Sequence, residues 1–209
     1  MTRNPQDDLQ PDGQPGRALR RGWTTGACAA AAAKAAYVGL LTGRFPDPVQ
    51  ITLPKGEQPS FSLVETRRCD QAARASIEKD AGDDPDVTHG AIITVKVCRG
   101  EPGSGLIFIA GEGVGVVTLP GLPVAVGEPA INPGPRKLIC SMVAEIAHSY
   151  GDSGDLEMTV SIPGGESMAK RTANERLGIV GGLSILGTTG IVIPYSCSAW
   201  IASIHRGID

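Results

Sequence analysis

The chain has 209 residues, and its 19 Lys and Arg against 22 Asp and Glu leave a formal net charge of −3. That balance offers no basic surface to a phosphate backbone, and aromatic residues at 4% offer few stacking platforms, so nucleic-acid binding is disfavoured. The N-terminus lacks a secretory signal, and no segment reaches the ~20 strongly apolar residues of a membrane span. We therefore expect a cytoplasmic protein with no membrane partner and an ordinary hydrophobic core.

The cysteines argue against a disulfide framework and against a zinc site. Their count of five is odd, their spacings are wide, and no C-x-x-C pair occurs. We expect small buried residues in a reducing compartment, and no metal site in the protein.

Order is predicted to begin near Leu19, because residues 1–18 are polar and rich in Pro, Gln and Asp, as in a disordered tail. Residues 27–41 form a predicted helix, since Ala has the highest helix propensity. Thr24 or Thr25 can cap its start, and Gly43 follows its end. Its small side chains permit close packing against a sheet.

Short segments rich in apolar residues predict the first set of strands, and the first two of them alternate apolar and polar residues. The segments concerned are 49–53, 61–66, 91–97, 106–110 and 114–119. The first two flank a Pro/Lys/Gly turn and are interpreted as a hairpin. Residues 67–79 are less decided, and their composition allows a short helix at 72–77.

The C-terminal half opens with a second predicted helix. The sequence Asn132-Pro133-Gly134-Pro135 marks its start, and it ends near Tyr150. Its predicted apolar face is traced by Leu138, Met142, Ile146 and Ser149. A strand is predicted at 156–162, two short apolar runs at 183–186 and 191–193, and a last helix over 198–206.

The order helix, strands, helix, strands favours an α+β fold over a doubly wound α/β sheet, which requires regular alternation. We predict a two-layer α/β sandwich with an antiparallel or mixed sheet, on which the Ala-rich N-terminal helix packs. Residues 19–209 form one α+β domain in this prediction.

A glycine-rich stretch, Gly111-Glu112-Gly113-Val114-Gly115, differs from the dinucleotide-binding fingerprint because strand-like sequence follows where a helix is required. It is either a tight turn between strands or a loop whose glycines let a ligand approach the backbone.

An acidic segment, 82–90, contains Asp83, Asp84, Asp86 and His89. Carboxylates at this density can hold ribose hydroxyls or position a general base beside the histidine. They can equally be Asx-turn residues of a solvated loop, and the sequence supports both interpretations.

Two predicted helix starts are candidate anion sites. Thr24, Thr25 and Gly26 follow Arg20 and Arg21, so free N–H groups, hydroxyls and cations stand together, although plain N-capping also explains the threonines. Arg136 and Lys137 stand at the second helix start. The Gly-Thr-Thr-Gly turn at 187–190 has a composition similar to the first start.

Four long blocks appear in the same order in one family. They are 20–36 (RRGWTTGACAAAAAKAA), 78–90 (EKDAGDDPDVTHG), 111–137 (GEGVGVVTLPGLPVAVGEPAINPGPRK) and 178–192 (GIVGGLSILGTTGIV). In them the chain resembles the cobalt-precorrin-5B C1-methyltransferases of anaerobic cobalamin biosynthesis, the CbiD family. The resemblance implies methyl transfer from S-adenosylmethionine to ring carbon C1 of a cobalt-bearing tetrapyrrole, with the cobalt arriving inside the substrate. It also implies an N-terminal α+β domain followed by a smaller α/β domain, and we expect this chain to lack the latter.

The resemblance gives the candidate residues hypothetical roles. His89, with Asp86 nearby, is the candidate catalytic base. The candidates for binding the tetrapyrrole carboxylates are Arg20, Arg21, Thr24, Thr25, Gly26, Arg136 and Lys137. The candidates for the methyl donor are Gly111, Gly113, Gly115, Asp83, Asp84, Thr188, Thr189 and Gly190.

Two other functions compete with this hypothesis. The chain could be a non-catalytic tetrapyrrole-binding domain that needs a further C-terminal part for donor binding and catalysis. Composition alone also allows a nucleotide- or phosphate-binding enzyme that uses the Thr/Gly helix starts. Self-association into a homo-oligomer is compatible with each of these functions.

Overall fold

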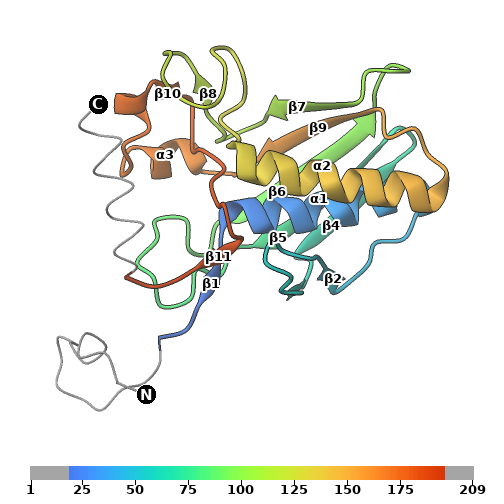
Figure 1. Cartoon of the computed structure of the whole chain (residues 1–209), viewed down its shortest axis with the longest axis horizontal. Helices are drawn as coiled ribbons and strands as arrows, with labels where there is room; N and C mark the ends of the chain where they lie inside the picture. Colours follow the sequence, from blue (N-terminus) through green and yellow to red (C-terminus); the bar gives the residue numbers. More distant parts are fainter. Residues whose placement is uncertain (1–18, 196–209) are drawn as a thin grey trace.

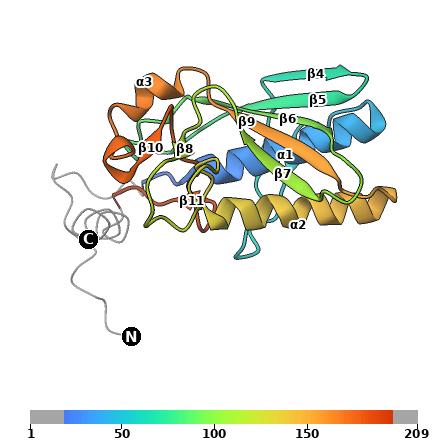
Figure 2. The ribbon, with the colours of Figure 1, turned by 90° about the horizontal axis from the view of Figure 1, so that it is seen from above.

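Two long helices lie on one face of a five-stranded mixed sheet (Figure 1, Figure 2). The computed structural model describes residues 19–195. In order across the sheet, the strands are β4 (Glu65–Cys69), β5 (Ala72–Glu78), β6 (Ile92–Arg99), β9 (Leu156–Ser161) and β7 (Leu106–Ala110). β7 and β9 are parallel, whereas the other neighbours are antiparallel. The predicted α+β fold with a mixed sheet is confirmed.

Helix α1 (Thr25–Thr42) confirms the helix predicted at 27–41. The Thr24 side-chain oxygen caps it by accepting a hydrogen bond from the Ala27 amide at 3.2 Å. The helix ends at Gly43, whose left-handed φ of 75° directs its amide to the Gly39 carbonyl. Both ends therefore follow from residues that the sequence already marks as caps.

The alanine run of α1 forms the centre of the hydrophobic core. All of its alanines between positions 27 and 36 are at most 1% exposed, because the sheet covers one side of the helix and α2 (Pro133–Tyr150) covers another (Figure 2). A methyl side chain lets the helix backbone approach both neighbours closely. The run therefore reflects tight packing as much as helix propensity.

Helix α2 begins with Pro133 after Asn132 and ends at Gly151, as predicted. Its buried residues are Pro135, Ile139, Met142, Val143, Ile146 and Ala147. The predicted face is partly wrong, because Ser149 is exposed and Leu138 is only half-buried. Contact with α1 selects a neighbouring stripe of the helix, which apolar spacing alone does not specify.

The central strands alternate between a buried face and an open face. Their buried inward residues on β5 and β6 are Ala73, Ala75, Ile77, Ile93, Val95 and Val97. The short helix allowed at 72–77 is therefore wrong. Pairing with β4 on one side and β6 on the other makes this alanine-containing segment a central strand.

Three short ribbons complete the fold. They pair β1 (Gly22–Trp23) with β11 (Ile191–Val192), β2 (Val49–Gln50) with β3 (Ser60–Phe61), and β8 (Val116–Val117) with β10 (Ile179–Val180). The β2–β3 pairing confirms the predicted hairpin, but 61–66 is not one strand, since β4 begins at Glu65. The strand predicted at 114–119 is shortened to β8. Helix α3 (Gly165–Ala169) and a 3-10 turn, η2 (Glu175–Leu177), lie near the β8–β10 ribbon (Figure 1).

Both long helices run in the same direction, so their N-termini lie at one end of the molecule (Figure 1, Figure 2). At the other end, fully buried Tyr37 of α1 donates to the Asp152 carboxylate just after α2, and Arg99 reaches the same carboxylate at 2.5 Å. This cluster joins the second half of α1 to the end of α2. A small pocket lies at the N-terminal end, and a groove extends from there along both helices as far as Lys34 and Glu145.

Two predictions fall outside the described residues, namely the tail at 1–18 and the helix at 198–206. Between residues 19 and 195, no helix combines the length and the apolar character needed to cross a bilayer.

Candidate functional site

The first turns of α1 and α2 touch each other. A Cβ on Gly26 would lie 2.6 Å from Cγ of Pro135, so this contact requires a residue without a side chain. The Gly26 amide donates to the Leu186 carbonyl at 2.8 Å, which joins the 186–188 segment to the start of α1. At the start of α2, a Cβ on Gly134 would lie 3.2 Å from the Gly187 carbonyl oxygen. The partial positive charge of the two helix N-termini favours anionic groups at this end of the molecule, although the Gly26 and Ala27 amides of α1 already have partners within the chain.

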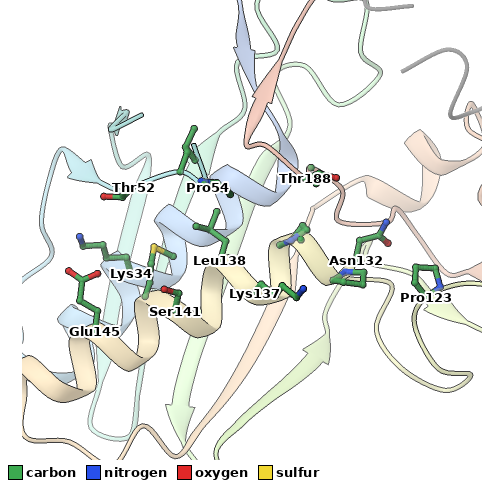
Figure 3. A pocket seen from close by; sticks show the side chains of 16 residues that line it. Lys34, Thr52, Pro54, Pro123, Asn132, Lys137, Leu138, Ser141, Glu145 and Thr188 are labelled. Atoms are coloured by element: carbon green, nitrogen blue, oxygen red, sulfur yellow. The ribbon is translucent and has the colours of Figure 1, made fainter. Parts of the chain in front are cut away.

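A groove of about 870 Å³ lies beside the two helices. Figure 3 shows side chains from α1, α2, the 52–54 segment and the 187–188 turn around it. Its volume falls within the range of about 300–1,000 Å³ that is typical of small-molecule sites. The groove is therefore large enough for a sizeable ligand.

The charged residues of the groove are Lys34, Lys137 and Glu145. Lys34 interrupts the alanine run of α1 and is half-buried, whereas the other two are exposed on α2. Figure 3 shows Lys34 and Glu145 at one end of the groove and Lys137 nearer the start of α2. The other walls include Leu53, Leu138 and Met142. Apolar walls with two cations suit a mainly apolar ligand that carries carboxylates.

A second, smaller pocket of about 260 Å³ borders the start of α1. Its polar lining consists of Thr24, Thr25, Lys79, Asp86, Thr88, Thr172, Asn174 and Ser184. Gly187 lines both this small pocket and the groove, so the two cavities meet at one residue of the 186–188 segment.

Lys79, Asp86 and Thr88 form a hydrogen-bonded network in the small pocket. The Lys79 side chain is 2% exposed, and its Nζ lies 2.5 Å from Asp86 Oδ2 and also donates to the Thr88 hydroxyl. The Thr88 amide and hydroxyl donate to Asp86 Oδ1 at 2.8 and 2.6 Å. Burial disfavours the charged carboxylate, but the ammonium and the Thr88 hydrogen bonds outweigh it, so the pKa of Asp86 is lowered. Asp86 is therefore ionised at neutral pH and is a weak base.

The structure places His89 away from the Asp86 carboxylate. His89 is exposed and lines neither cavity. Its Nδ1 accepts a hydrogen bond from the Ala81 amide at 3.1 Å and lies 3.8 Å from Asp80 Oδ1. Because Nδ1 is the acceptor, Nε2 carries the proton of the neutral ring. The carboxylate that faces the histidine is thus Asp80.

The acidic loop is held together by its own side chains. Asp83 Oδ2 accepts from the Arg20 amide at 2.7 Å, and Asp84 Oδ1 accepts from the Tyr195 amide at 3.2 Å. Arg20 pairs through Nη2 with Asp80 Oδ1 at 3.0 Å and holds the pKa of that carboxyl below its usual range. These contacts agree with the loop interpretation of the carboxylates. Within residues 19–195, no three His, Cys, Asp or Glu side chains come close enough to hold a metal ion.

The cationic candidates separate in the structure. Arg136 donates to the carbonyl of Ile131 at 2.8 Å and to that of Pro129 at 3.1 Å, and its guanidinium lies 5.0 Å from the centre of the Phe108 ring. It therefore ties the segment before α2 to strand β7. Lys137 alone of the pair lines the groove. Arg21 is exposed, and like Arg20 it lines neither cavity.

The glycines predicted to meet the donor pack against the chain itself. At Gly111, an added Cβ would lie 2.1 Å from Ser161 Oγ. At Gly113 it would lie 2.0 Å from the Ile162 carbonyl oxygen, and at Gly115 it would lie 2.4 Å from Ile179 Cγ2. Internal packing therefore explains these glycines by itself.

The remaining donor candidates also serve the local structure. Thr189 bonds the Ile191 backbone through its hydroxyl at 3.2 Å, and a Cβ on Gly190 would lie 2.5 Å from Leu53 Cδ2. Thr188 is the only one of the eight donor candidates that lines either cavity described here. Donor binding by this set stays a prediction.

Two of the three cationic residues that line the cavities, Lys34 and Lys79, were not predicted from the sequence. A signal existed for Lys34, because it is the single charge within an alanine helix. Lys79 carries no comparable signal, since it follows a strand directly and resembles a solvated strand end.

The fold and its cavities define an α+β protein with a large groove that runs from the paired N-termini of two helices along both of them as far as Lys34 and Glu145. The CbiD family model matches residues 12–194. The chain therefore belongs to the CbiD family, as the sequence resemblance predicted.

The relatives share most of this chain. The cobalt-precorrin-5B C(1)-methyltransferase of Paramagnetospirillum magneticum is 64% identical over 193 residues, which cover 92% of this chain and 54% of that protein. The protein of the same name from Agrobacterium fabrum is 60% identical, covering 93% and 51%. A crystal structure of the cobalamin biosynthesis protein (cbiD) from Archaeoglobus fulgidus matches with a TM-score of 0.66 and 33% identity, over 90% of this chain and 59% of that one. The chain spans about half the length of the curated relatives it matches.

Proposed function

We propose that this chain takes part in the methylation of ring carbon C1 of cobalt-precorrin-5B, with S-adenosylmethionine as the methyl donor. The proposal is supported by 64% identity to a relative named as that methyltransferase. The physical observation that carries it is the groove of about 870 Å³ with Lys34 and Lys137 on its walls. Cobalt belongs to the substrate in this proposal.

The groove is the proposed site of the tetrapyrrole. A macrocycle of this class carries many acetate and propionate groups on an apolar ring system. Leu53, Leu138 and Met142 offer apolar contact to the ring, and the ammonium groups of Lys34 and Lys137 pair with carboxylates at its edge. The donor supplies an electrophilic methyl group, so the chain must above all hold the two reactants in line.

His89 stays the candidate base for a proton lost from the ring. In the observed geometry it accepts a proton at Nδ1 only by giving up its hydrogen bond from the Ala81 amide. The role therefore predicts a local rearrangement of the 80–90 loop. We further propose the cytoplasm as the compartment, in line with the free thiols of Cys28, Cys69, Cys98 and Cys140.

A methyl-transfer assay with cobalt-precorrin-5B tests the proposal. Purified chain, labelled S-adenosylmethionine and substrate should give a product heavier by one methyl group, together with S-adenosylhomocysteine. Lys34→Gln and Lys137→Gln should each weaken substrate binding several-fold, whereas Lys170→Gln, on an exposed residue outside the groove, should not. Equal binding by all three variants would remove the groove as the tetrapyrrole site.

A non-catalytic tetrapyrrole-binding domain is the second candidate function. It is favoured by the dispersal of the donor candidates, of which Thr188 alone lines a described cavity. This function predicts that the chain binds the tetrapyrrole but neither S-adenosylhomocysteine nor the methyl donor. Methyl transfer by the 209-residue chain alone excludes it.

A further inference from the structure

Two polar side chains, Thr25 and Lys79, line the small pocket from almost fully buried positions. Thr25 is 5% exposed, and Lys79 is 2% exposed. The Lys79 ammonium has three donors, of which Asp86 and Thr88 occupy two within residues 19–195. The third N–H of the buried ammonium and the Thr25 hydroxyl are therefore groups of this pocket that can bind a ligand.

The wall around Thr25 favours a negative group. Thr25 is the first residue of the 18-residue helix α1, and the first turn of that helix contains no acidic residue to occupy its positive end. A carboxylate placed there would accept from the Thr25 hydroxyl and from the third Lys79 N–H. Because the Gly26 and Ala27 amides already donate within the chain, the hydroxyl and the ammonium would supply these hydrogen bonds.

The wall around Asp86 favours a positive group. Asp86 lines the same pocket with 24% of its side chain exposed, and the Lys79 and Thr88 contacts keep it ionised. Its charge also disfavours a doubly negative phosphate beside it. A cation-binding and an anion-binding wall therefore face one cavity of about 260 Å³, which is slightly smaller than a site for a whole ligand.

We propose that the small pocket binds a zwitterionic α-amino-acid group, namely the methionine end of the methyl donor. The ligand carboxylate lies at Thr25 and the start of α1, and the ligand ammonium lies at Asp86. The assignment rests on the proposed function, because S-adenosylmethionine has such an end. Gly187 borders both cavities, so a donor held here would have its remaining atoms beside the groove.

Calorimetric titration of the 209-residue chain tests the assignment with two probes. S-adenosylhomocysteine carries the amino-acid end, whereas 5′-methylthioadenosine has the nucleoside and the sulfur without it. Thr25→Val should weaken S-adenosylhomocysteine binding roughly tenfold or more, the loss expected for one hydrogen bond to a charged group. Methylthioadenosine binding should not change. Thr25→Ser should restore affinity, and Thr159→Val, on the open face of the sheet, is the matched control.

Three results would overturn the assignment. The first is that the wild-type chain binds no S-adenosylhomocysteine, which would mean that it has no donor pocket. This result would leave the groove proposal intact if the chain still bound the tetrapyrrole. Equal weakening of both probes by Thr25→Val means that the pocket does not recognise the amino-acid end. Weakening of cobalt-tetrapyrrole binding alone means that the pocket holds a carboxylate of the macrocycle instead. Failure of the proposed function is distinct, since it appears as absent tetrapyrrole binding and absent methyl transfer.

Discussion

Replacing Lys79 by Met breaks the buried ion pair of the small pocket. Methionine keeps the length of the apolar stem but removes the ammonium. Asp86 then loses its charged partner, while its two hydrogen bonds from Thr88 stay in place. The Lys79 side chain is 2% exposed, so the variant tests a charge pair that solvent screens only at the Asp86 side.

The expected loss follows from the exposure of the two partners. Breaking a fully buried pair costs about 3–5 kcal/mol, because one charge stays buried and uncompensated. Asp86 is 24% exposed and retains Thr88, so the loss should lie lower, at about 2–3 kcal/mol. For a domain of this size that corresponds to a fall in Tm of about 4–12 °C.

Urea unfolding followed by circular dichroism measures this loss in a double-mutant cycle. The second single variant is Asp86→Asn, which keeps an oxygen acceptor for the Thr88 amide. The free energy of unfolding lost in the double variant should be smaller than the sum of the two single losses by at least about 1 kcal/mol. Lys96→Met, exposed on β6, is the control and should stay within about 0.5 kcal/mol of wild type. Additive losses, or a Lys79→Met loss as small as the control, would refute the reasoning.

The same pair predicts a pH dependence. The pKa of Asp86 is lower in the folded chain than its ordinary value of about 3.9. The stability that the pair contributes is therefore fully present above that ordinary value and is lost as the pH falls through the folded-state pKa. The Tm difference between wild type and Lys79→Met should shrink below about pH 4. A difference that is constant from neutral to acid pH would contradict this.

Three further predictions concern the packing around α1. Gly187→Ala should lower the free energy of unfolding in urea by at least about 2 kcal/mol, because φ of Gly187 is 128° and the new Cβ would lie 2.1 Å from Oγ1 of the cap residue Thr24. An unchanged urea midpoint would contradict this prediction. Burial raises the pKa of the Cys28 thiol to about 12, so peptide mapping after alkylation at pH 8 should find exposed Cys69 modified and Cys28 intact. Equal modification of both thiols in folded protein would show that α1 is more open. Ala33→Leu should lower the unfolding free energy by about 1–3 kcal/mol through overpacking, and a stabilised variant would show spare room beside the helix.

Local signals in the sequence predict the frame of this protein well. The caps at Thr24 and Gly43 define α1, and the Pro-rich start and Gly151 define α2. Short apolar-rich runs predict β6 and β7, and apolar/polar alternation predicts β9. These features depend on backbone propensity and on side-chain periodicity, which a short segment carries by itself.

The sites show where local reasoning stops. Arg136 stands beside Lys137 in the sequence, yet one holds backbone carbonyls and the other lines the groove. Asp86 and His89 are close in the chain, but the carboxylate pairs with Lys79 and the histidine faces Asp80. Neighbouring residues on a turn or a helix point in different directions, so proximity along the chain does not bring their functional groups together.

The sequence by itself determined the family, the α+β class, the two long helices and the residue types gathered at their starts. Only the tertiary structure decided that 72–78 is a central strand, which stripe of α2 is buried, and that Lys34 and Lys79 reach cavities. The first set follows from local propensity and from long matching blocks. The second set depends on which surfaces meet when the sheet, α1 and α2 pack together, and that choice is made by contacts between residues far apart in the chain.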